Sequence, residues 1–154
     1  MQIRHGTEAD ADAILDLHVR SIREICSRDY TPEQIEAWVG PKRAAHYLEP
    51  IRGQRLWVAE RDGRVVGLGD YHATRNEICA VYIHPDFVGQ GIGRALFQVV
   101  TRELKARGFS EAVLDASLTS VGFYEAMGCR KIEESQHMFR PGVFIPCVRM
   151  AVQL

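Results

Sequence analysis

The sequence predicts a mixed α/β fold in which a mostly antiparallel central sheet of about seven strands is flanked by about four helices. Three observations lead to this prediction. Stretches with apolar residues at every second position alternate with stretches of helical periodicity. The tight-turn signal Asp62-Gly63 joins two adjacent strand-like runs. A glycine-rich turn separates a strand from an amphipathic helix, which is typical of a crossover between parallel strands.

The first third of the chain predicts one strand followed by helices. Residues 1–5 form a short strand, and an acidic segment capped by threonine then starts a helix that continues to about residue 28. Thr31 caps a second helix, because Pro32 occupies the first helical position and Gln34 lies three residues after the cap. Pro41 opens a third, short helix.

The rest of the chain predicts three strands, a helix, a strand, a short helix and two strands. The first two of these strands form a hairpin, and the long helix has one apolar face and ends at Gly108. In chain order the elements cover residues 55–60, 65–73, 77–84, 93–107, 112–116 and 123–127, and the two closing strands meet near Pro141-Gly142.

Composition narrows the class of protein. The 154 residues fit a single domain spanning 1–154. A net charge of -1 argues against a dedicated nucleic-acid binder. No apolar run approaches the roughly 20 residues of a membrane span, and the polar N-terminus does not resemble a signal peptide. We therefore expect a cytoplasmic protein without a membrane partner. The four cysteines form no C-x-x-C pair, so we expect reduced thiols and no metal site.

The glycine-rich turn predicts a phosphate-binding site. Alternating glycines let the backbone approach a bulky anion, and the N–H groups at the start of the following helix hold phosphate with the help of the helix dipole. Arg94 adds a charged contact in the first turn. A turn that needs glycine only for its geometry is the alternative. The residues of this candidate site are Val88, Gly89, Gln90, Gly91, Ile92, Gly93 and Arg94.

Two common nucleotide-binding patterns do not match this turn. A P-loop ends in Gly-Lys-Ser/Thr, whereas Gly93 is followed by Arg94-Ala95. In the dinucleotide fingerprint G-x-G-x-x-G, counted from Gly89, the third glycine would fall at Arg94. Neither pattern therefore identifies a ligand for this turn.

The turn and the segment after it resemble the Gcn5-related N-acetyltransferases (GNAT). With His84-Pro85-Asp86 before it, the turn is similar to their acetyl-CoA pyrophosphate loop, Gln/Arg-x-x-Gly-x-Gly/Ala, although Val88 replaces the first residue. A second, independent stretch looks like the family's fifth strand and fourth helix. It consists of Leu114-Asp115-Ala116-Ser117 and Phe123-Tyr124-Glu125-Ala126-Met127-Gly128, and Cys129 follows where the family usually has Phe. The resemblance spans nearly the whole chain and implies the acyl-CoA N-acyltransferase fold with acetyl-CoA as co-substrate.

The resemblance also implies catalytic roles. Tyr124 matches the general acid that protonates the leaving thiolate of CoA. The alternative is that Phe123 and Tyr124 are only the aromatic face of a packed helix. Glu77, at the start of the strand before the loop, matches a catalytic glutamate found in part of the family and is the expected base, directly or through water. An ordinary strand-end glutamate is the alternative, and Asp115 and His84 are rival bases.

Further contacts with CoA follow from the same resemblance. In the family the fourth and fifth strands splay apart, and the pantetheine arm lies in the gap. Val81, Tyr82 and Ile83 are expected to provide main-chain contacts. Ser117 and Thr119 are expected to provide hydroxyl contacts where many members have an asparagine.

The predicted function is transfer of an acetyl group from acetyl-CoA to a primary amine of a small molecule, by direct attack in a ternary complex. A protein or peptide acceptor is one alternative, and a non-catalytic CoA-binding sensor or interaction module is another. The segments that usually contact the acceptor carry aromatic and histidine residues that suit many amines. A homodimer is expected from the habit of the family alone.

Overall fold

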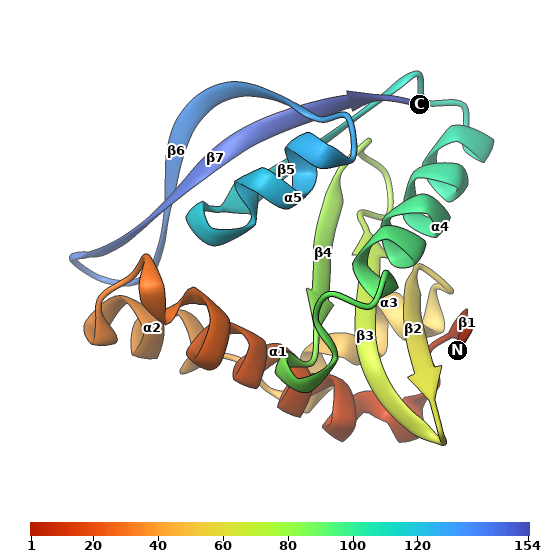
Figure 1. Cartoon of the computed structure of the whole chain (residues 1–154), viewed down its shortest axis with the longest axis horizontal. Coiled ribbons are helices and arrows are strands. Elements are labelled where there is room, and N and C mark those ends of the chain that lie inside the picture. Colours follow the sequence, from red (N-terminus) through yellow and green to blue (C-terminus); the bar gives the residue numbers. More distant parts are fainter.

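The chain forms two antiparallel sheets that lie side by side (Figure 1). The computed structural model describes all residues from 1 to 154. The first sheet has the order β1-β2-β3-β4, and its strands are β1 (Gln2–His5), β2 (Leu56–Arg61), β3 (Arg64–Tyr71) and β4 (Ile78–Ile83). The second sheet has the order β5-β7-β6, with β5 (Glu111–Ser117), β6 (Arg130–Arg140) and β7 (Val143–Gln153). The predicted fold class and the seven strands are confirmed.

Five helices cover the two sheets, close to the number that the sequence predicts. They are α1 (Ala11–Ile25), α2 (Pro32–Val39), α3 (Leu48–Arg52), α4 (Ile92–Ala106) and α5 (Val121–Ala126). α1 and α3 pack on one face of the first sheet and α4 on the other, while α2 packs against β6 and β7. None of these helices has the length and apolar character that crossing a bilayer requires.

Most predicted boundaries hold to within about two residues, because local signals fix them. Thr31 and Gln34 form the expected capping box, with the Gln34 N–H donating to Thr31 Oγ1 at 3.2 Å. The hairpin turn has positive φ at both of its residues, +51° at Asp62 and +76° at Gly63, as a two-residue turn of this kind requires. β3 ends earlier than predicted, at Tyr71, because His72 Nδ1 accepts two N–H groups of the following turn.

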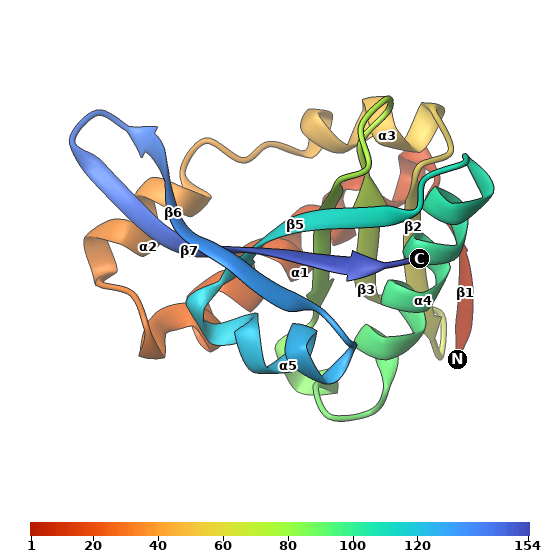
Figure 2. The ribbon, with the colours of Figure 1, turned by 90° about the horizontal axis from the view of Figure 1, so that it is seen from above.

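The two sheets meet at a single point and then diverge (Figures 1 and 2). Glu77, just before β4, forms one parallel bridge with Val113 of β5. Next to it, the Val113 N–H donates to Asn76 O at 2.8 Å, and Asn76 Nδ2 donates to Glu111 O at 2.8 Å. α4 is therefore the predicted crossover between parallel strands, and β4 and β5 each keep one edge without a partner strand.

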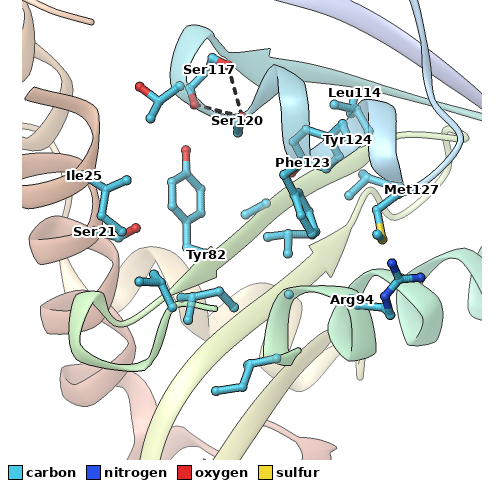
Figure 3. Close-up of a pocket in the computed structure, with 18 of the residues that line it drawn as sticks. Ser21, Ile25, Tyr82, Arg94, Leu114, Ser117, Ser120, Phe123, Tyr124 and Met127 are labelled. Atoms are coloured by element: carbon cyan, nitrogen blue, oxygen red, sulfur yellow. Dashed lines mark hydrogen bonds between the residues drawn. The ribbon is translucent and has the colours of Figure 1, made fainter. Parts of the chain in front are cut away.

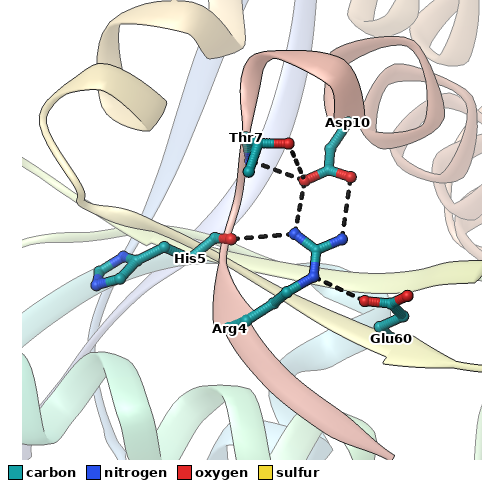
Figure 4. Close-up of polar contacts among 5 residues, drawn as sticks. All are labelled: Arg4, His5, Thr7, Asp10 and Glu60. Carbon is teal, nitrogen blue, oxygen red and sulfur yellow. Dashed lines mark hydrogen bonds and ion pairs between the residues drawn. The ribbon is translucent and has the colours of Figure 1, made fainter. Parts of the chain in front are cut away.

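The N-terminal strand is fastened by a polar cluster around Arg4 (Figure 4). Arg4 donates through Nη1 and Nη2 to both oxygens of Asp10, at 2.8 and 3.1 Å, and through Nε to Glu60 at 2.7 Å. Asp10 also accepts the N–H of Thr7 at 2.7 Å. Because Arg4 lowers the pKa of Asp10, this carboxylate stays charged. The Arg4 guanidinium therefore joins β1 to β2 through Glu60 and to the start of α1 through Asp10.

Candidate active site

A cavity of about 530 Å³ lies in the gap between β4 and β5 (Figure 3). Both strands line it, together with the glycine turn, the start of α4, the loop after β5 and α5, and α1 closes one side. Twelve of the fourteen residues that the sequence proposes for the site line this cavity: Val81, Tyr82, Ile83, Val88, Gly89, Gly91, Ile92, Gly93, Arg94, Ser117, Thr119 and Tyr124. Gln90 and Glu77 do not.

The glycine turn has the geometry of an anion cradle. Gly89 and Gly91 have φ of +77° and +81°, and a side chain added at either would project into open space. Gly91 is the N-cap of α4, so the unpaired N–H groups of a 15-residue helix begin directly at the cavity. A side chain at Gly93 would lie 3.2 Å from the Phe123 ring, so glycine here allows α5 to approach. Gln90 points elsewhere and accepts a hydrogen bond from Arg61.

Two tyrosines bring hydroxyl groups to the cavity. Tyr124, on α5, is 6% exposed and packs against the rings of Phe97 and Phe123, 6.0 and 5.0 Å away. Its hydroxyl has no hydrogen-bond partner within the protein, and burial raises its pKa far above the ordinary value. It therefore remains a protonated donor at neutral pH. Tyr82 points its hydroxyl toward the loop after β5 (Figure 3), and burial raises its pKa in the same way.

The side chain of Tyr82 was not expected in the site. The sequence assigns this residue only a main-chain contact, but strand alternation turns its ring toward α1, where it packs 4.1 Å from the His18 ring. Ser21 and Ser120 also line the cavity without having been predicted. No local motif marks these residues, because they lie on different elements, Tyr82 on β4, Ser21 on α1 and Ser120 in the loop after β5, and only the tertiary fold brings them to one cavity.

The loop after β5 is fixed by hydrogen bonds from its own hydroxyls and from Tyr30. Ser117 Oγ donates to Ser120 Oγ at 2.8 Å, and Thr119 Oγ1 donates to Asp29 at 2.6 Å. Tyr30 accepts the N–H of Leu118 at 2.9 Å and donates to the carbonyl oxygen of Pro146 at 2.6 Å. This one hydroxyl therefore joins the loop to β7.

The base candidates occupy different places. The carboxylate of Glu77 lies beside Arg75 and Arg149, at 3.4 and 3.9 Å, outside the lining of the cavity. Asp115 lines the cavity and pairs with Arg149 at 3.1 Å. His84 is 3% exposed and uses Nδ1 to accept the N–H of Asp86, so it serves the turn after β4. Of the three, only Asp115 borders the cavity.

Comparison with known proteins agrees with the fold. Residues 26–154 match the family model described as an acetyltransferase (GNAT) domain. The uncharacterized N-acetyltransferase YafP of Escherichia coli (strain K12) is 24% identical over 136 residues, which cover 88% of this chain and 85% of that protein. Human N-acetyltransferase 8B is 31% identical over 94 residues, but the match covers only 41% of that longer protein.

Solved structures share the same architecture. A GCN5-related N-acetyltransferase from Rhodopseudomonas palustris superposes with a TM-score of 0.91 at 26% identity, over 99% of this chain and 95% of that one. The PaiA N-acetyltransferase of Thermoplasma acidophilum, solved in complex with coenzyme A, superposes with a TM-score of 0.81 at 22% identity, over 99% and 98%. This chain therefore belongs to the GNAT family of N-acetyltransferases, which use acetyl-CoA.

Proposed function

We propose that the chain acts as one domain that transfers the acetyl group of acetyl-CoA to a primary amine of a small molecule, by direct attack in a ternary complex. One observation supports this most. The anion cradle at the start of α4 and the unpaired, protonated hydroxyl of Tyr124 both open on the same cavity between β4 and β5. One extended ligand that carries a pyrophosphate and a thioester needs both kinds of group in one cavity.

Different residues along the cavity bind different parts of acetyl-CoA. The N–H groups of the glycine turn and Arg94 bind the pyrophosphate. The free edge of β4, at Val81, Tyr82 and Ile83, offers main-chain groups to the amides of the pantetheine arm. Held in this way, the thioester lies beside the hydroxyl of Tyr124.

In the reaction the amine nitrogen forms a bond with the acetyl carbon, and the bond from that carbon to sulfur breaks. Tyr124 donates its proton to the leaving sulfur, which departs as the thiol of CoA. The proton of the amine passes to a base. We assign this role to Glu77 acting through water, and the alternative is Asp115, which borders the cavity and shares Arg149 with Glu77.

Calorimetry with acetyl-CoA tests the binding step. We expect saturable binding to the parent chain and none to Gly91→Glu, because this change places a carboxylate where the pyrophosphate lies and forces a side chain onto a φ of +81°. The absence of binding to the parent at millimolar acetyl-CoA would refute the proposed function.

Kinetics with the same protein test the catalytic roles. We expect Tyr124→Phe to lower turnover by about 100-fold and to leave the Kd for acetyl-CoA within about twofold. Unchanged turnover would remove Tyr124 as the acid. Comparison of the pH profiles of Glu77→Gln and Asp115→Asn identifies the base, because only loss of the true base removes the acidic limb of the profile.

A screen for thiol release identifies the acceptor class. Small primary amines and peptides with free amino groups are offered in parallel with acetyl-CoA. We expect release above the rate of hydrolysis with small amines. Turnover confined to peptides would favour the protein acceptor, and background release with every amine would favour a CoA-binding module without catalysis.

A further inference from the structure

Three strands of the second sheet bring together a carboxylate, an imidazole and a thiol on the face that lies toward α2. They are Asp115 of β5, His137 of β6 and Cys147 of β7, the strand between the other two. One ligand atom from each lies within 4.8 Å of the other two. The register explains this meeting, because Cys147 is paired with Ser117 on one side and Ser135 on the other, so the two longer side chains reach over it diagonally.

The distance between the carboxylate and the imidazole suits a tetrahedral metal ion. Asp115 Oδ2 and His137 Nε2 are 3.2 Å apart. Two ligand atoms that are each about 2.0 Å from a tetrahedral Zn²⁺ lie about 3.3 Å from one another. The other carboxylate oxygen, Oδ1, accepts a hydrogen bond from Arg149 at 3.1 Å. This bond orients the carboxylate and leaves Oδ2 as the ligand atom, an arrangement common around protein metal sites.

The kinds of ligand select the class of ion. A thiolate and an imidazole favour zinc and similar transition metals, whereas magnesium and calcium take oxygen ligands. Cys147 is 5% exposed, while the His137 side chain is 45% exposed. The thiol is therefore shielded from solvent, and the metal has a route of entry from the histidine side.

We propose that Asp115, His137 and Cys147 bind one divalent cation of the zinc class, with a fourth position open to water or another ligand. Cys147 binds as the thiolate, and its proton passes to solvent. Since Asp115 also lines the cavity, the ion lies at the cavity wall and adds positive charge there. The ordinary explanation of the cluster is an ion pair between His137 and Asp115 above a buried thiol. The proposal does not depend on the proposed function.

Titration of the purified full chain with Co²⁺, under a reductant that contains no thiol, tests the site. We expect one equivalent of Co²⁺ to produce the absorption band of a thiolate bound to cobalt. Zn²⁺ should displace it, and competition with a coloured chelator gives the Kd for Zn²⁺. His137→Ala should weaken Zn²⁺ binding by about tenfold or more, and Cys147→Ser should abolish the cobalt band.

A control variant, and a check that each variant folds, are needed to interpret the metal titrations. Cys79→Ser removes an exposed thiol that lies outside the cluster, so it should leave both signals unchanged. If Cys147→Ser does not fold, His137→Ala, a change at an exposed position, carries the test. The absence of a thiolate band in the parent chain, or a Kd for Zn²⁺ that His137→Ala leaves unchanged, would leave only the ion pair and overturn the proposal.

Discussion

Removal of the Tyr30 hydroxyl should destabilise the protein and loosen the loop that lines the cavity. In Tyr30→Phe the Leu118 N–H and the Pro146 carbonyl oxygen both lose their partner. Tyr30 is 6% exposed, so the phenylalanine leaves little room for water to replace the hydroxyl. Each neutral hydrogen bond contributes about 1 kcal/mol, and an unpaired buried group costs about 1–3 kcal/mol.

The two losses together predict a decrease of about 2–6 kcal/mol in the free energy of unfolding. For a chain of this size each kcal/mol corresponds to about 2–4 °C, so the Tm should fall by about 4–24 °C. Urea unfolding followed by circular dichroism measures the change in free energy, and calorimetry measures the Kd for acetyl-CoA. We expect the Kd to rise several-fold, because Leu118 stands between Ser117 and Thr119 in the cavity wall.

Tyr71→Phe is the matched control for this prediction. Tyr71 is 3% exposed, and its hydroxyl makes no hydrogen bond within the protein. The guanidinium of Arg107 lies over its ring at 4.9 Å and retains that contact with phenylalanine. We expect a loss below about 0.5 kcal/mol. If Tyr30→Phe costs no more than Tyr71→Phe, the assignment of the Tyr30 hydroxyl as the tie between the loop and β7 is wrong.

Three further predictions concern stability. Burial raises the pKa of Asp70 to about 7 from 3.8, so the contribution of its protonated form to stability is present below pH 4 and is lost as the pH rises through 7. In urea titrations, the free energy of unfolding of Asp70→Asn should therefore rise by on the order of 2–4 kcal/mol relative to that of the parent between pH 4 and pH 8. A difference between the two proteins that stays constant with pH would refute this prediction. Arg4→Met should lower the free energy of unfolding by about 1–2 kcal/mol at pH 7, and by less at low pH, where Asp10 becomes protonated. An equal loss at pH 2 would contradict the ion pair between Arg4 and Asp10. In Gly67→Ala the new methyl group would lie 2.8 Å from the Leu96 side chain, so we expect the free energy of unfolding, measured by urea titration, to fall by about 1–3 kcal/mol. A stabilised variant would show that α4 moves away freely.

The sequence predicts best those features that a few neighbouring residues determine. The Asp62-Gly63 turn and the capping box at Thr31 each follow from the chemistry of two to four residues, and both are confirmed. The glycine turn belongs to this group, since positive φ and the start of α4 both follow from its spacing.

The sequence does not predict which side chains from distant elements lie together in the fold. The sequence predicts Glu77 as the base, but it does not predict that the carboxylate lies beside Arg75 and Arg149, outside the lining of the cavity. The ring of Tyr82 and the cluster around Cys147 depend on which strands become neighbours, and the order β5-β7-β6 is not the order of the sequence. The sequence predicts no metal site because spacing along the chain offers none, whereas the three donors of the site proposed above lie on three different strands.

The free edges of β4 and β5 also affect the stability and the aggregation of the protein without its ligand. An unpaired strand edge tends to pair with another chain, and here two such edges face a gap inside the molecule. A ligand that binds in the gap as proposed covers the free edge of β4 and binds only the folded form. At 100 times its Kd it would add about 2.7 kcal/mol to the free energy of unfolding. The supply of acetyl-CoA would then set the resistance of this chain to heat and aggregation as well as its rate of turnover.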